Sequence, residues 1–240
     1  MFRSMNQHRT LLLALSLALA GLASCATNAM SHRTSNTNPD ERLAELLKEY
    51  DRARSGHTEG GDSDHVLIDG ERVRNQIERL ALEFPRHAPT LLANAVLARE
   101  NRQPEKAEGY CDAALAVQPV NPEVAVLKAQ LAIEANNLAG ARRLLAAQVE
   151  YTPNHAALRE TYAALLLSAG ELGEAQKQLA AAERLGAPAW RVAFNQGLLA
   201  EARKDRAAAR KAYESCLAAR PDYAPAQARL AGMNAEGGVQ

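Results

Sequence analysis

Residues 122–155 read PEVAVLKAQLAIEANNLAGARRLLAAQVEYTPNH and hold one complete copy of a pattern that recurs along the chain. The pattern is clearest in its small residues. One column with a constant spacing of 34 residues contains Ala107, Ala141, Ala175 and Ala209, and the column twelve residues before it contains Ala95, Ala129, Ala163 and Gly197. Columns that agree in phase indicate a true internal repeat, because chance would match one column and not several.

Two more columns describe how each copy is built. Four residues after each alanine of the first column stands Cys111, Leu145, Leu179 or Tyr213, and twelve residues after it stands Pro119, Pro153, Ala187 or Pro221, with Pro188 directly after Ala187. Two antiparallel helices approach closely only where side chains are small, and a larger residue then fills the next gap. Proline stops the second helix before the next copy begins. Each copy therefore predicts a pair of helices.

A 34-residue period with a small residue in the first helix, an Ala followed four residues later by a larger one in the second, and a closing Pro resembles the tetratricopeptide repeat (TPR). The resemblance implies an all-α, right-handed superhelical solenoid of antiparallel helix pairs, with repeats at 88–121, 122–155, 156–189 and 190–223. The family's large aromatic residue early in the first helix is absent, which predicts looser packing between neighbours. Leu91, Ala125, Arg159 and Ala193 stand in its place.

Incomplete units are expected at both ends of the array of 88–234. Residues 40–87 predict a degenerate repeat: one helix over 40–54 carries Leu43, Leu46, Leu47 and Tyr50 on one face, and a second covers 69–84. Residues 55–64 form a Gly-rich insertion between them. After the last full repeat, a short helix over 225–233 is expected to cap the array, and residues 235–240 are expected to be disordered.

The N-terminus predicts secretion and a lipid anchor. Residues 1–24 combine basic Arg3 and Arg9 with an apolar run over 11–22, which spans only about 18 Å as a helix and is too short to cross a bilayer. Leu22-Ala23-Ser24-Cys25 resembles the bacterial lipobox, which implies lipidation of Cys25; an ordinary signal peptide cleaved near Ala26 is the alternative. In Gram-negative lipoproteins the absence of Asp directly after this Cys implies export to the outer membrane, and here Ala26 stands at that position. The polar residues 25–39 are expected to form a flexible tether.

Composition narrows the function classes. Hydrophobic residues make up 47% of the chain but aromatic residues only 4%, which favours helices rich in Ala and Leu. The net charge is zero, and −2 without residues 1–24, so no basic stripe for nucleic acid is present. No nucleophile motif, phosphate-binding glycine loop or His-Glu zinc helix occurs. We therefore expect neither an enzyme nor a cofactor.

The chain also holds cysteine and histidine residues that could carry chemistry. Cys111 and Cys216 lie three repeats apart, about 30 Å in a solenoid and far beyond disulfide range, so both are expected to be small buried side chains. The insertion holds His57, Glu59 and Asp62, which could bind a divalent metal, although acidic Gly-rich loops are usually solvated and no metal site is predicted. His87 and His155 occupy equivalent turns between repeats.

The TPR resemblance implies a binding groove lined by the first helix of each pair. The residues that helical geometry places there mix apolar centres with charged edges; they are Leu92, Val96 and Arg99, then Glu123, Val126, Gln130 and Ile133, then Glu160, Ala164 and Leu167, then Arg191, Phe194, Leu198 and Glu201. The Lys and Asn pairs with which chaperone-binding members hold a terminal carboxylate are absent. The groove suits an amphipathic helix or an extended segment. Alternatively, these side chains cover one another, or the N-terminal segment covers them.

These expectations converge on a non-enzymatic outer-membrane lipoprotein that acts as an adaptor. It resembles pilotins, which assist pilus secretins, and other TPR lipoproteins of envelope assembly, which implies envelope protein partners and a membrane contact through the lipid. Two alternatives stay open: a regulator or localiser of a cell-wall enzyme, and a metal or small-ligand sensor that uses the His-rich insertion. The oligomeric state is not predicted.

Overall fold

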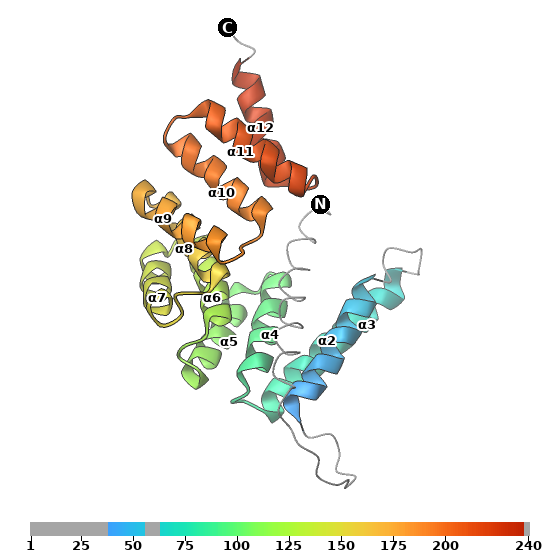
Figure 1. Cartoon of the computed structure of the whole chain (residues 1–240). Helices are drawn as coiled ribbons and strands as arrows, with labels where there is room; N and C mark the ends of the chain where they lie inside the picture. Colours follow the sequence, from blue (N-terminus) through green and yellow to red (C-terminus); the bar gives the residue numbers. More distant parts are fainter. Residues whose placement is uncertain (1–37, 56–62, 238–240) are drawn as a thin grey trace. The chain divides into compact units, whose positions relative to one another are not determined.

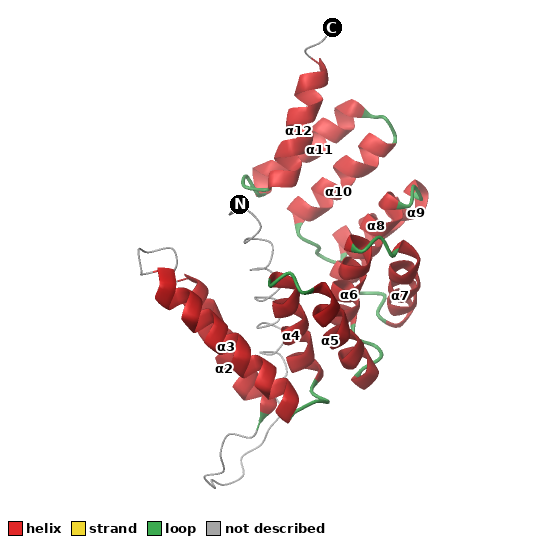
Figure 2. Ribbon diagram, turned by 180° about the vertical axis from the view of Figure 1, so that it is seen from behind, coloured by secondary structure: helices red, strands yellow, loops and turns green. Residues whose placement is uncertain are grey.

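A computed structural model describes residues 38–55 and 63–237, and these residues form eleven α-helices and no strand (Figure 1 and Figure 2). The structure divides into two compact units, one ending at Pro119 and the other beginning at Val120. Consecutive helices pair within each unit, which confirms the predicted all-α repeat fold. None of the described helices is long and apolar enough to cross a bilayer.

The first unit contains α2 (Pro39–Ser55), α3 (Ser63–Glu83), α4 (Ala88–Glu100) and α5 (Pro104–Val117). Helices α2 and α3 form one pair and α4 and α5 the next, and α3 also packs on α4. The predicted apolar stripe of α2 is buried at Leu43, Leu47 and Tyr50. Helix α3 begins at Ser63, whereas the sequence predicted a start near residue 69. The predicted insertion 55–64 therefore loses residues at both ends to helices.

The second unit contains three helix pairs and a final helix. The pairs are α6 (Pro122–Glu134) with α7 (Leu138–Tyr151), α8 (Ala156–Ser168) with α9 (Leu172–Arg184), and α10 (Ala189–Ala202) with α11 (Arg206–Ala219). Helix α8 also contacts α6 and α10, so the first helices of successive pairs lie against one another. Helix α12 (Ala224–Gly237) packs on α11 (Figure 1). It is longer than the predicted cap, and residues 235–237 are helical where a disordered tail was expected.

The small-residue columns lie at the helix contacts. Ala107, Ala141, Ala175 and Ala209 are at most 1% exposed. The fourth repeat has glycine in the other column: a Cβ built on Gly197 would lie 2.3 Å from Cε1 of Tyr213. Tyr213 is fully buried and stands where the other repeats have Cys or Leu. The larger ring in α11 therefore requires the smaller residue in α10.

The turns inside the pairs share one conformation. Four turn residues spaced by 34 have a positive φ; they are Arg102 (57°), Asn136 (58°), Gly170 (75°) and Lys204 (62°). At the last turn, the Lys204 N–H donates to the Glu201 carbonyl at 2.8 Å and the Asp205 N–H to the Ala200 carbonyl at 2.9 Å, the two bonds of a Schellman motif. Only one of the four residues is glycine, so the others carry a backbone cost of about 1 kcal/mol each.

Cys111 and Cys216 lie fully buried in α5 and α11, as small interior side chains. Burial raises the pKa of the Cys216 thiol. The predicted signal peptide 1–24, lipidation site Cys25, tether residues 26–37 and the His57, Glu59 and Asp62 side chains of the insertion lie outside the described residues.

Candidate functional site

The second unit has two successive junctions between first helices, and each joins a glutamate of one helix to a basic residue at the start of the next. We call the contact between α6 and α8 the Glu123 junction and the contact between α8 and α10 the Glu160 junction. Their sequence separations are similar, 32 residues between Glu123 and His155 and 31 between Glu160 and Arg191. The two junctions differ in burial and in hydrogen bonding.

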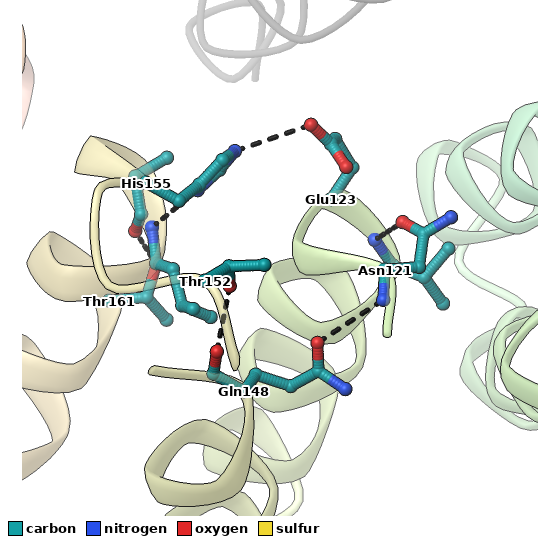
Figure 3. A network of polar contacts seen from close by, with 9 residues as sticks. Asn121, Glu123, Gln148, Thr152, His155 and Thr161 are labelled. Carbon is teal, nitrogen blue, oxygen red and sulfur yellow. Dashed lines mark hydrogen bonds and ion pairs between the residues drawn. The ribbon is translucent and has the colours of Figure 1, made fainter. Parts of the chain in front are cut away.

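At the Glu123 junction, His155 makes two bonds with its ring. Nδ1 accepts a hydrogen bond from the Leu158 N–H at 3.1 Å and so caps α8, while Nε2 lies 3.3 Å from Glu123 Oε1 (Figure 3). A ring nitrogen that accepts a backbone N–H carries no proton, so the proton is on Nε2, which donates to the carboxylate. This bond lowers the pKa of the half-exposed Glu123 carboxyl. Both ring nitrogens of His155 therefore have a partner.

A second layer of bonds fixes the turns beneath His155. The Asn121 N–H donates to Gln148 Oε1 at 3.2 Å, Asn121 Oδ1 caps α6 by accepting from the Val124 N–H, and Thr152 Oγ1 donates to the Gln148 carbonyl at 2.7 Å (Figure 3). These bonds tie the end of α7 to the start of α6. The first unit repeats the histidine contact: His87 Nε2 lies 3.0 Å from Asp40 Oδ1. We conclude that the histidine and carboxylate pair is a structural element of the repeat.

At the Glu160 junction, the carboxylate is buried. Glu160 is 4% exposed, and its Oε1 accepts from Arg191 Nε at 2.7 Å and, at 3.5 Å, from Asn195 Nδ2. Glu160 Oε2 is buried and has no hydrogen-bond partner among the described residues. Burial raises the pKa of Glu160, although the charge and the hydrogen bond of Arg191 act in the opposite direction. An unsatisfied buried acceptor costs about 1–3 kcal/mol, so this arrangement destabilises the fold.

Aromatic rings lie close to Arg191, the hydrogen-bond partner of this carboxylate. Trp190 and Tyr223 pack edge to face with centroids 4.9 Å apart, and Phe194 packs edge to face on Tyr223 at 5.1 Å. The guanidinium carbon of Arg220 lies 4.3 Å from the Trp190 centroid. Burial raises the pKa of Tyr223. Arg191, which donates to Glu160, has its guanidinium carbon 5.9 Å from the Trp190 centroid, so this arginine links the rings to the carboxylate. The site therefore combines a partly satisfied carboxylate with ring surfaces that accept cations.

The structure distributes the predicted groove residues over both units and several roles. Leu92, Val96 and Arg99 belong to α4 of the first unit, where the first two are buried. In the second unit, Val126 lies in the core that Ile133 also contacts, and Gln130 and Leu167 are partly buried. Phe194 and Leu198 pack on the core that α10, α11 and α12 form together. Glu123 pairs with His155, and Glu201 pairs with Arg229 of α12 at 3.0 Å.

Glu160 and Arg191 are the two predicted groove residues that the structure joins directly, and that pairing was not predicted. The roles of Trp190, Asn195, Arg220 and Tyr223 at this junction were not predicted either. Trp190 gave a usable signal, since it is the only tryptophan in the chain. Whether the groove residues bind a partner stays a prediction.

The described residues contain no group of three or more His, Cys, Asp or Glu side chains that could hold a metal ion. The insertion to which the sensor alternative refers has its His57, Glu59 and Asp62 outside those residues. The sensor alternative therefore stays a prediction.

Among the comparisons with known proteins, only the comparison of structures found matches, and these matches identify the fold. No protein-family model matches the sequence, and no protein of curated function matches it either. A thermophilic TPR protein of Thermus thermophilus superposes with a TM-score of 0.61 at 14% identity, over 78% of this chain and 98% of that one. A tetratricopeptide repeat protein from Parabacteroides merdae gives 0.60 at 17% identity, over 96% and 79%. YrrB, a TPR protein with an unusual peptide-binding site, gives 0.51 at 17% identity, over 79% and 96%. The chain has the TPR fold.

Proposed function

We propose that this protein is a non-enzymatic adaptor that holds a segment of another protein on the face formed by α6, α8 and α10, the first helices of the pairs in its second unit. Cys25 is its lipid anchor to the outer membrane. Three observations support the proposal. The TPR fold presents successive first helices side by side, the lipobox-like sequence at Leu22–Cys25 fits a lipoprotein, and the Glu160 junction carries a polar atom that the described part of the fold leaves unsatisfied.

The unsatisfied Glu160 oxygen is the observation that carries the proposal. Buried polar groups are usually hydrogen-bonded, and three buried side-chain atoms of the described residues are without a partner: Gln76 Oε1, the Tyr213 hydroxyl and Glu160 Oε2, of which only the last belongs to a carboxylate group. Glu160 keeps one acceptor unused, and its partner Arg191 lies at the edge of an aromatic cluster, where binding energy is commonly concentrated. A bound segment that donates to this oxygen would remove a cost that the unbound protein bears.

The binding face is tested by photo-crosslinking in intact cells. A photoreactive phenylalanine analogue replaces Leu198, which shares a helical face with Arg191 and Asn195 at spacings of seven and three residues. The control position is Lys211, an exposed residue of the second helix α11. We expect discrete adducts from position 198 and none from position 211. Equal adduct patterns at both positions would contradict the proposed face.

The identity of the crosslinked partner separates the biological roles. A secretin or another envelope-assembly component would support the pilotin-like role, and a cell-wall hydrolase or synthase would support the regulatory one.

The anchor is tested by Cys25→Ser. The variant should move from the membrane fraction to the soluble periplasmic fraction, because a lipidated cysteine binds a bilayer far more tightly than a single acyl chain does. If the variant stays in the membrane fraction, Cys25 is not the anchor.

A further inference from the structure

The unused oxygen of Glu160 has a defined chemical requirement. As a carboxylate oxygen it only accepts hydrogen bonds, so its missing partner is a donor. Its sister atom Oε1 already takes the bond from Arg191 Nε, and Asn195 Nδ2 divides its donation between that atom and the Arg191 carbonyl at 3.1 Å. No described side chain donates to Oε2. A donor to Oε2 would therefore have to come from outside the described residues of this chain.

The charge balance favours a positively charged donor. Within the described part of the chain, Arg191 is the cation bonded to Glu160, and it is partly exposed, with 28% of its side chain accessible. The raised pKa of Glu160 has burial as its main cause, so one partly exposed arginine compensates the carboxylate incompletely. A second cation can join without competing with Arg191, because the two oxygens of a carboxylate accept from separate donors.

The Trp190 and Tyr223 rings already bind cations of this chain. Arg220 lies over Trp190 at 4.3 Å and over Tyr223 at 5.8 Å, and Arg191 lies 5.9 Å from the Trp190 centroid. Arg220 has its own carboxylate, since its Nε lies 3.5 Å from Asp222 Oδ1. Both arginines are thus paired with carboxylates, and the ring surface suits the alkyl stem of a long basic side chain.

We propose that the bound segment places a lysine or arginine side chain against Trp190 and Tyr223, with its cationic group donating to Glu160 Oε2. This inference rests on the proposed function and specifies the chemistry of its ligand. Binding completes a triad in which Arg191 and the basic residue of the partner share one carboxylate. Because Oε2 is buried, binding requires the partly exposed Arg191 side chain to move and open a path to this oxygen.

The experiment uses the full-length protein in detergent micelles and two probes whose backbone termini are blocked. One is N-acetyl-lysine N-methylamide, and the other carries an additional acetyl group on the side-chain amine, which removes its charge. Trp190 supplies a single indole fluorescence and NMR signal, since no other tryptophan is present in the sequence. We expect a saturable shift of this signal with the lysine probe and about tenfold weaker binding of the acetylated probe.

Two variants make the assignment specific. Glu160→Gln keeps an acceptor and the side-chain shape but loses the charge, and it should weaken the lysine probe about tenfold. Glu171→Gln is the matched control, because Glu171 lies at the start of the second helix α9, outside the proposed binding face, and pairs with Arg142 of this chain. It should leave probe binding unchanged. Equal binding of both probes to the wild type, no response to the lysine probe, or equal affinity of Glu160→Gln would overturn the inference.

The outcome for the proposed function is read separately. If Leu198 crosslinks the same partner in wild type and Glu160→Gln with equal yield, and the probes do not discriminate charge, the binding face stands and the basic ligand is wrong. If the photoreactive residue at position 198 gives no specific adducts in the otherwise wild-type protein, the binding face itself is wrong.

Discussion

The Glu123 and Glu160 junctions both join one first helix to the next, but the pKa values of their carboxylates shift in opposite directions. Each connects a first helix to the next through a carboxylate and a basic group. At the Glu123 junction the carboxylate is half-exposed, bonds to His155 and has a lowered pKa. At the Glu160 junction the carboxylate is buried, only one of its two oxygens is hydrogen-bonded, and its pKa is raised. The Glu123 junction shows that the fold can join its repeats without such a cost, so the cost at Glu160 needs another explanation, such as ligand binding.

The largest effect is expected from Gly197→Ala, which disrupts the contact between α10 and α11 without altering the charges of the Glu160 junction. The new methyl group overlaps the buried Tyr213 ring, and after the gain in helix propensity we expect a loss of about 2 kcal/mol in the free energy of unfolding. Urea denaturation measures it. In a Tyr213→Leu background the same substitution should no longer destabilise. Equal losses in both backgrounds would show that the ring does not set the limit.

His155→Ala should weaken the Glu123 junction by about 1 kcal/mol, because α8 loses its capping acceptor and Glu123 loses its donor. His155→Asn separates the two contributions, since asparagine can cap the helix but does not reach Glu123 in the same way. We expect this variant to recover most of the stability in thermal unfolding. A neutral His155→Ala would mean that the junction is held by packing alone.

Glu160→Gln should change stability in the opposite direction to Glu123→Gln. The amide at position 160 avoids burying a charge, so near neutral pH we expect the free energy of unfolding to rise by at most about 1 kcal/mol, measured by urea denaturation. Glu123→Gln should lose a few tenths of a kcal/mol, since that pair is half-exposed. If both variants are destabilised, the two junctions are alike and the contrast fails.

The same pair predicts opposite pH dependence of stability. Because the folded pKa of Glu160 lies above its ordinary value of 4.5, ionisation costs stability as pH rises above that value, and the advantage of Glu160→Gln should grow from pH 4 to neutral. The folded pKa of Glu123 lies below 4.5, so its contribution is present above that value and is lost as pH falls through the folded pKa. Unfolding curves of both variants and the wild type across this range measure the difference.

The smallest effect concerns the turns that close α8 and α10. Lys204 has a positive φ where the preceding repeat has Gly170, so Lys204→Gly should stabilise the protein by about 0.5 kcal/mol after the larger unfolded-state entropy of glycine is subtracted. Gly170→Ala is the reverse control and should destabilise. Thermal unfolding distinguishes them. A destabilised Lys204→Gly would indicate that the lysine side chain stabilises its turn.

The repeat fold was predictable because small residues at a constant spacing report helix contacts directly. Ala95, Ala129 and Ala163 are fully buried, as their column required. The start of α3 was misplaced because Ser63 and Asp64 look like loop residues as readily as helix-starting ones. The Glu160 junction was predicted only as separate groove positions. Burial and hydrogen-bond satisfaction depend on which rotamers meet across a junction, and a periodic pattern does not encode that.

The fit between Gly197 and Tyr213 makes the helix pair, and not the single helix, the unit that evolution can copy or exchange. Helix α11 brings a tyrosine that only a glycine-bearing α10 accommodates, whereas α8 presents Ala163 at the corresponding position. A recombination that joined α8 to α11 would set a methyl group against that ring. Duplication of α10 and α11 together keeps the match. The array can therefore be lengthened without a clash only if new helices are inserted between pairs and not within one.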